Sequence, residues 1–197
     1  PISRDLTNGP GRETNPLFRN YGTVSTLAPA GKSTKTLYAG TDDGNLWYTH
    51  DVSDITAWTK ATDPDLPTAW VTRVRVDPRD PSGNTAYVTY SGFRQDDNAP
   101  YILKTTDGGK NWSDITANLP AAPLNDVTVV HDSVVVASDV GVFFRRAGSA
   151  TWLRLGNGLP LAPAYELRLQ KATDTLYVGT FGRSAWKTSA AVLAAGG

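Results

Sequence analysis

The chain contains no cysteine and no methionine among its 197 residues, and it has only two histidines. Without cysteine it can form neither disulfides nor thiolate metal sites, and thiol catalysis is excluded. His50 and His131 lie far apart in the sequence and have no neighbouring cluster of ligand residues. We therefore expect no metal site and no cofactor.

An excess of one charge and a long apolar run are also missing. Lys plus Arg and Asp plus Glu are equal at 19 each, and no stretch is rich in Lys or Arg, so a nucleic-acid partner is not expected. The longest apolar stretch, residues 190–195, is far shorter than the roughly 20 residues of a membrane-spanning helix. The chain begins at Pro1, which suggests a processed product or a fragment of a longer precursor.

A repeat dominates the sequence. Short segments rich in β-branched, aromatic and small residues recur with starts spaced by about 42 to 49 residues, at 37–41, 86–90, 134–138 and 176–180. Each is followed by a second strand-like segment. In the first three units a segment that opens with tryptophan comes next, then a Leu-Pro link and an alternating strand that begins the next unit. The 13 prolines and 18 glycines interrupt every helical pattern, and only residues 189–195 could be helical. The sequence predicts an all-β fold of four-stranded antiparallel units, a β-propeller of about four blades.

The expected blades cover four ranges, 21–64, 69–118, 124–157 and 164–188. The fourth lacks an outer strand of its own, whereas residues 2–7 resemble an outer strand without a preceding blade. Residues 2–7 therefore either close the last blade of a four-bladed ring or belong to a neighbouring blade in a larger propeller. Since four-bladed rings are uncommon and an open edge must be covered, we expect half of a larger propeller, with the complementary N-terminal half as a possible partner.

One motif carries a family resemblance. Residues 105–112, Thr-Thr-Asp-Gly-Gly-Lys-Asn-Trp, resemble the Asp-box of BNR-repeat propellers, Ser/Thr-x-Asp-x-Gly-x-Thr-Trp, with Asn111 in place of threonine. The resemblance implies a hairpin between the third and fourth strands of a blade, with Thr105, Asp107, Gly109 and Trp112 as structural residues. Asp107 can form an Asx-turn, Gly109 can adopt the turn conformation, and the indole of Trp112 can pack on the blade, which suits a structural role. Over its whole length the chain is similar to sortilin/Vps10-like propellers of bacterial secreted proteins, and it shares the box with sialidases and xyloglucanases, so we expect secretion.

Candidate catalytic residues are few. The only glutamates are Glu13 and Glu166. Tyr165 beside Glu166 is similar to a sialidase nucleophile pair, but no arginine triad can be aligned, and a strand-edge pair is the alternative. Asp96 and Asp97 could supply one half of the carboxylate pair that a glycoside hydrolase needs, with the other half outside this chain.

Binding residues are better represented. Residues 91–100 form the longest interruption between paired strands, where recognition residues usually lie. Phe93 and Arg94 are residue types that anchor protein contacts, and an aromatic flanked by carboxylates also suits sugar stacking. Residues 181–186 resemble the closing stretch of BNR propellers, in which Arg183 fixes a strand end or contacts a ligand. We expect a secreted, non-catalytic module that binds a protein or a glycan. The alternative is the C-terminal part of a BNR-type glycoside hydrolase.

Overall fold

The computed structural model describes residues 1–9, 22–31 and 35–194. Its strands form four antiparallel sheets, each built from consecutive strands, so the all-β propeller prediction is confirmed. The first two blades are β1 (Val24–Pro29), β2 (Leu37–Thr41), β3 (Leu46–Thr49) and β4 (Thr59–Lys60), then β5 (Trp70–Val76), β6 (Ala86–Ser91), β7 (Tyr101–Thr105) and β8 (Ser113–Asp114). The last two are β9 (Leu124–Val130), β10 (Ser133–Ser138), β11 (Gly141–Arg145) and β12 (Leu153–Arg154), then β13 (Ala164–Gln170), β14 (Thr175–Thr180) and β15 (Ala185–Ser189).

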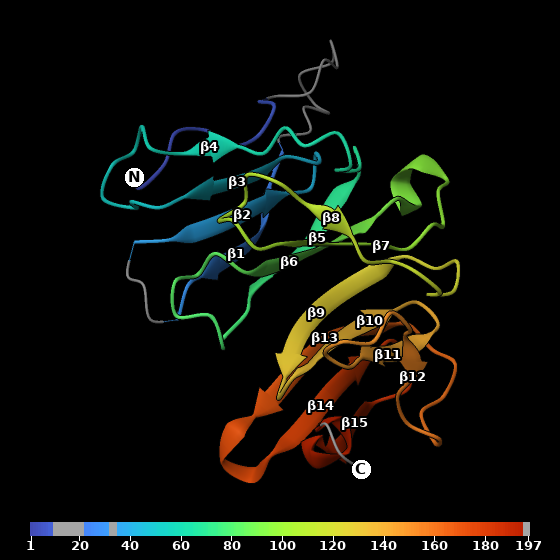
Figure 1. Ribbon diagram of the computed structural model, residues 1–197. Coiled ribbons are helices and arrows are strands. Elements are labelled where there is room, and N and C mark those ends of the chain that lie inside the picture. The colour runs from blue at the N-terminus through green and yellow to red at the C-terminus, as the bar shows by residue number, and fades with distance from the viewer. Residues whose placement is uncertain (10–21, 32–34, 195–197) are drawn as a thin grey trace.

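The first strands of successive blades pack side by side, β1 with β5, β5 with β9 and β9 with β13. Figure 1 shows the resulting open arc, with the first blade and the last blade at opposite ends of the view. The second strands β2, β6 and β10 are buried at every position, because each lies inside a sheet that has neighbours on both faces. This is why the repeated segments read as continuous apolar and small residues instead of alternating ones.

A β-bulge recurs near the start of every first strand, and the bulged residues are Ser25, Thr72, Asn125 and Tyr165. In the first three blades its side chain donates a hydrogen bond to a backbone carbonyl of the next blade. The Ser25 hydroxyl bonds to Val71 (2.5 Å), the Thr72 hydroxyl to Leu124 (2.8 Å) and the Asn125 amide to Ala164 (3.0 Å). The bulges thus aim a polar side chain at the neighbouring sheet and fix the blade-to-blade register.

Asp126 is bonded to both neighbouring blades, and its side chain is fully buried. Its carboxylate accepts hydrogen bonds from Arg73 Nε of the preceding blade (2.8 Å) and from the Leu167 amide of the following blade (2.7 Å). It also accepts one from the amide of Val127 (2.8 Å). One carboxylate therefore joins three consecutive blades. The sequence offered only a lone aspartate at the start of an apolar strand as a sign of this role.

The N-terminal segment differs from the expected outer strand. Residues 2–7 form no strand and lie on the outward face of the first blade, where Leu6 is buried with Trp47 and Trp58. The indole of Trp47 donates to the Leu6 carbonyl (2.7 Å), and that of Trp58 donates to the Ile2 carbonyl (2.8 Å). The side chains of Trp47 and Trp58 hold this segment on the blade, whereas the prediction assumed backbone pairing with a neighbouring strand.

The chain leaves the last blade after its third strand. At Ser189 it turns into the short 3-10 helix η4 (Ala190–Leu193), whose Ala190 and Leu193 are fully buried against the third blade. The hydroxyl of Ser133 donates to the Leu193 carbonyl (2.7 Å) and holds the helix there. The sheet β13-β14-β15 consequently has three strands in the described chain. The expected C-terminal helix is thus one turn, and Glu13 lies outside the described residues.

Candidate functional site

The turn between β7 and β8 contains residues 105–112, which resemble an Asp-box, and it is called the Asp-box turn below. The Asp107 carboxylate accepts hydrogen bonds from the backbone amides of Lys110 (3.1 Å) and Asn111 (3.0 Å), and from the Asn111 side chain (2.7 Å). The Thr105 hydroxyl accepts one from the Gly109 amide (3.1 Å). Gly108 and Gly109 have φ angles of 81° and 97°, a region that disfavours side chains. Trp112 is buried, and its ring meets Tyr38 of the first blade edge to face at 6.4 Å.

Burial works to raise the pKa of Asp107, but its hydrogen bonds with Asn111, Thr105 and Lys110 together outweigh burial and lower the pKa to about 2. A carboxylate held in its charged form by local donors is poorly suited to general acid chemistry at neutral pH. Its bonds all end within the same turn. The arrangement therefore suits a turn-stabilising residue.

The carboxylates considered for catalysis lie in the connection between β6 and β7. Asp96 is exposed and closes the 3-10 helix η2 (Phe93–Gln95) in a left-handed conformation, with φ of 55°. Asp97 accepts hydrogen bonds from the Tyr101 hydroxyl (2.6 Å) and the Ala99 amide (2.8 Å), and these bonds lower its pKa. A glycosidase acid requires a raised pKa. The geometry of Asp97 thus favours a loop-stabilising role.

Tyr165 and Glu166 lie at the start of β13, on the first strand of the last blade. Glu166 forms an ion pair with Arg168, both half exposed. Tyr165 is half exposed, and its ring meets Phe181 edge to face at 6.2 Å. No contact between the Tyr165 hydroxyl and Glu166 is found in the described chain. The two side chains are directed to different partners, an arrangement that does not resemble an activated nucleophile and its base.

The binding candidates form a more ordered group. Arg94 lies over the indole of Trp70 at 4.8 Å, and its guanidinium pairs with Asp42 of the first blade at 3.1 Å. Phe93, beside it, is 69% exposed. The cation–π contact and the ion pair hold Arg94 across the junction of two blades, while Phe93 projects to solvent. The length of the loop points to Phe93 and Arg94, but no local pattern connects Trp70 and Asp42 to them, because these residues come from other segments of the chain.

The loop end of the propeller is the end formed by the turns after the second strands, residues 42–45, 92–100, 139–140 and 181–184. Phe181 and Arg183 lie in the last of these turns; Phe181 is 70% exposed. The Arg183 carbonyl accepts a hydrogen bond from the Trp186 indole (2.6 Å), which closes the turn. The Asp-box turn lies at the opposite end of its blade, since it joins the third strand to the fourth.

The described residues contain no group of three or more His, Cys, Asp and Glu residues that could hold a metal ion. Within the same ranges, no helix is long and apolar enough to cross a membrane.

No family model matches the sequence, and no curated protein matches it either. Solved structures do resemble it. The Dos1 propeller superposes with a TM-score of 0.61 and 15% identity, covering 92% of this chain and 48% of that one. A structure described as YCF48 bound to D1 peptide superposes with a TM-score of 0.58 and 15% identity, covering 91% of this chain and 54% of that one. The GH74 xyloglucanase from Xanthomonas campestris superposes with a TM-score of 0.66 and 11% identity, covering 87% of this chain and 30% of that one.

The chain thus spans about half the length of the Dos1 propeller and of YCF48, and less than a third of the xyloglucanase. At identities of 11 to 15%, these likenesses show the fold and not the ligand. The chain has the β-propeller fold, arranged as an open set of four blades.

Proposed function

We propose that this chain is a secreted, non-catalytic β-propeller module that binds a protein or a glycan through its loop end. The observation that supports the proposal best is the Phe93–Arg94 pair. Arg94 is fixed by Trp70 and Asp42, and Phe93 is left 69% exposed. An exposed aromatic beside a pre-oriented arginine is the combination that dominates binding energy at many interfaces. Secretion is proposed from the resemblance to secreted BNR propellers.

Fixing Arg94 before the ligand arrives lowers the conformational entropy lost on binding. The Arg94 side chain is half exposed, and a guanidinium has five N–H donors, which leaves donors for an acidic group or a hydroxyl of the ligand. Phe181 and Tyr165 extend the aromatic surface at the last blade, and both are at least half exposed. The loop end therefore offers aromatic side chains on separate blades, which suits an extended ligand.

The test compares the wild-type chain with Phe93→Ala, Arg94→Ala and a matched control, Leu153→Ala, on a glycan microarray and against a displayed random-peptide library. Leu153 is also an exposed apolar residue, 48% exposed, but it belongs to the outer strand β12. We expect ligands of the wild-type chain to lose about tenfold or more in affinity with either loop variant and to keep their affinity for the control. Ligands that bind all four proteins equally would contradict the proposal.

The enzyme alternative has its own test. A hydrolysis assay on xyloglucan oligosaccharides is expected to show no turnover by the wild-type chain. Turnover that disappears in Asp97→Asn or Asp96→Asn would establish the glycoside hydrolase alternative and refute the non-catalytic module.

A further inference from the structure

The last blade differs from the other three in one respect that creates a cavity. Each of the first three blades places a tryptophan directly before its fourth strand, at Trp58, Trp112 and Trp152, and each of these is only 3% exposed. Trp112 and Trp152 pack against the preceding blade, in clusters with Ala61 and with Leu119 respectively. The last blade has neither a fourth strand nor the tryptophan that would precede it in the described chain.

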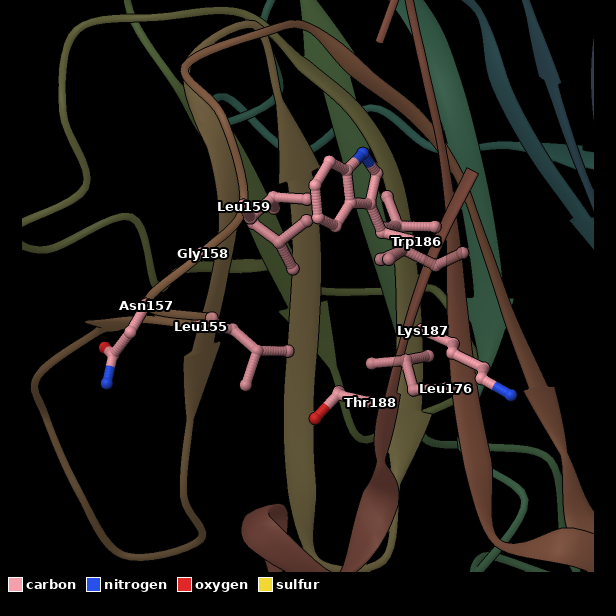
Figure 2. Close-up of a pocket in the computed structure, with 12 residues that line it drawn as sticks. Leu155, Asn157, Gly158, Leu159, Leu176, Trp186, Lys187 and Thr188 are labelled. Carbon is pink, nitrogen blue, oxygen red and sulfur yellow. The ribbon is translucent and has the colours of Figure 1, made fainter. Parts of the chain in front are cut away.

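A cavity of about 280 Å³ lies in the corresponding place, between the third and the last blade. Leu155 and Leu159 line it from the third blade, and Leu176, Trp186 and Thr188 line it from the last. Figure 2 shows the side chains of Leu155 and Leu159 on one side of the hollow and those of Leu176, Trp186 and Thr188 on the other.

The strand register shows which residue of a complete blade lies at the position of this cavity. Thr188 pairs with Leu176 just as Thr105 pairs with Ala86, at equivalent positions of the two blades. In the second blade Trp112 comes immediately before Ser113, which pairs with Lys104, so the indole lies opposite Thr105. Opposite Thr188 the described chain provides no residue, because after Ser189 it turns into η4.

A backbone contact repeats in the same way. Three residues after each tryptophan, an aliphatic residue donates its amide to the third strand: Ala61 to Leu46 (2.8 Å), Ile115 to Ile102 (3.0 Å) and Leu155 to Val142 (2.8 Å). The two residues between the tryptophan and the aliphatic residue are exposed in each of these three blades. The equivalent carbonyl of the last blade is that of Ala185, on the outer edge of its sheet.

We propose that β15 is a binding edge for an extended segment of a partner polypeptide with the pattern Trp-x-x-aliphatic, which adds as a fourth strand and buries its indole in the cavity. The edge would supply backbone hydrogen bonds, and the cavity would select the tryptophan, as in other modes of strand addition. The occupant follows from the three completed blades of this chain, which show what covers this surface when a fourth strand is present. Trp186 lines this cavity and also closes the neighbouring loop-end turn through the Arg183 carbonyl. The proposal is argued from the missing fourth strand and uses neither Phe93 nor Arg94, so it stands independently of the proposed function.

The experiment titrates the full chain with a peptide of residues 109–118, which contains Trp112, and with the same peptide carrying Trp112→Ala, by isothermal titration calorimetry. We expect saturable binding of the tryptophan peptide and about tenfold or more loss with the alanine peptide. Equal binding of both peptides, or no binding up to about 1 mM, would overturn the proposal.

Three variants of the chain locate the site. Thr188→Trp places an indole beside the cavity and should abolish peptide binding, whereas Tyr177→Trp places one on the opposite face of the same blade and should not. Trp186→Ala removes an indole that lines the cavity and is 41% exposed, so it should weaken binding without unfolding the chain. Unchanged binding by Thr188→Trp and Trp186→Ala, in proteins with wild-type circular dichroism, refutes the site. A dimer by light scattering that becomes monomeric on deletion of residues 1–8 would identify a second copy as the occupant and refute the partner segment.

Discussion

Gly40 and Gly179 occupy equivalent positions in the first and last blades, and the same substitution should have different effects at the two sites. A Cβ atom on Gly40 would lie 2.2 Å from Val71 Cγ1 and 2.7 Å from Val71 Cβ, both in the next blade. On Gly179 the nearest atom would be Glu166 Cβ at 4.0 Å, an ordinary contact. Gly40 is needed because two blades meet there, whereas no blade in the described part of the chain covers Gly179.

Gly40→Ala should lower the free energy of unfolding by about 1 to 3 kcal/mol, the usual cost of overpacking a close-packed interior. Gly179→Ala should leave it unchanged or raise it slightly, since alanine reduces the entropy of the unfolded chain. Ala137, at the same position of the third blade, is tolerated because it packs in a cluster with Ala164, where Val71 stands in the second blade.

Urea denaturation monitored by tryptophan fluorescence measures both variants against the wild type. The reasoning about blade contacts is refuted if Gly40→Ala lies within about 0.5 kcal/mol of the wild type, which is the range of ordinary surface substitutions. A loss at Gly179 as large as that at Gly40 would show instead that the outer face of the last blade is covered in solution.

The remaining predictions concern three other contacts. Asp107→Ala should cost roughly 1 to 3 kcal/mol by thermal unfolding, because turn amides lose their acceptor, with little effect on ligand binding. Since the folded-state pKa of Asp107 is about 2, below its ordinary value of 3.8, its contribution is complete above about pH 4 and is lost as the pH falls toward 2, so Asp107→Asn should flatten the acid side of the stability curve. A selective loss of binding with unchanged stability would mean that Asp107 belongs to a ligand site. Asp126→Ala should cost about 3 to 5 kcal/mol in urea titrations, because it leaves Arg73 and two amides without their buried acceptor, and an effect under about 1 kcal/mol would refute its role as the link between three blades. Deletion of residues 1–8 should uncover Trp47 and Trp58, shift their fluorescence to longer wavelength and lower the melting temperature, and a deletion protein with the wild-type spectrum and melting temperature would contradict the packing of Leu6.

The architecture could be predicted from the sequence because each blade repeats a local pattern. The buried second strands can be recognised as short runs of β-branched and small residues. Glycine indicates the turns after them, as at Gly44 and Gly141, which have positive φ. Strand ends were less predictable. The fourth strands contain only two paired residues each, since the tryptophan side chain, more than backbone pairing, holds this part of the blade.

What could not be predicted depends on contacts between segments distant in sequence. The hydrogen bonds of Asp126 come from two other blades, and the partners of Arg94 lie 52 and 24 residues before it, at Asp42 and Trp70. Residues 2–7 resemble an outer strand in sequence, yet they are held by hydrogen bonds from the indole N–H groups of Trp47 and Trp58. Sequence periodicity reports the local conformation, but it does not report which distant surface a segment will cover.

The arrangement of the blade explains why these uncertainties affect function more than fold. The inter-blade hydrogen bonds from the bulge residues recur in the first three blades, and so does the buried tryptophan before each fourth strand. Phe93, Arg94, Phe181 and the cavity beside Trp186 do not recur, and each lies where one blade departs from the common pattern. A repeated element must satisfy the same packing at every copy, whereas a departure from the repeat is free of that constraint and can be selected for a ligand. In this chain the longest inserted loop and the incomplete last blade are the two largest departures, and they are the two places where a binding role is proposed.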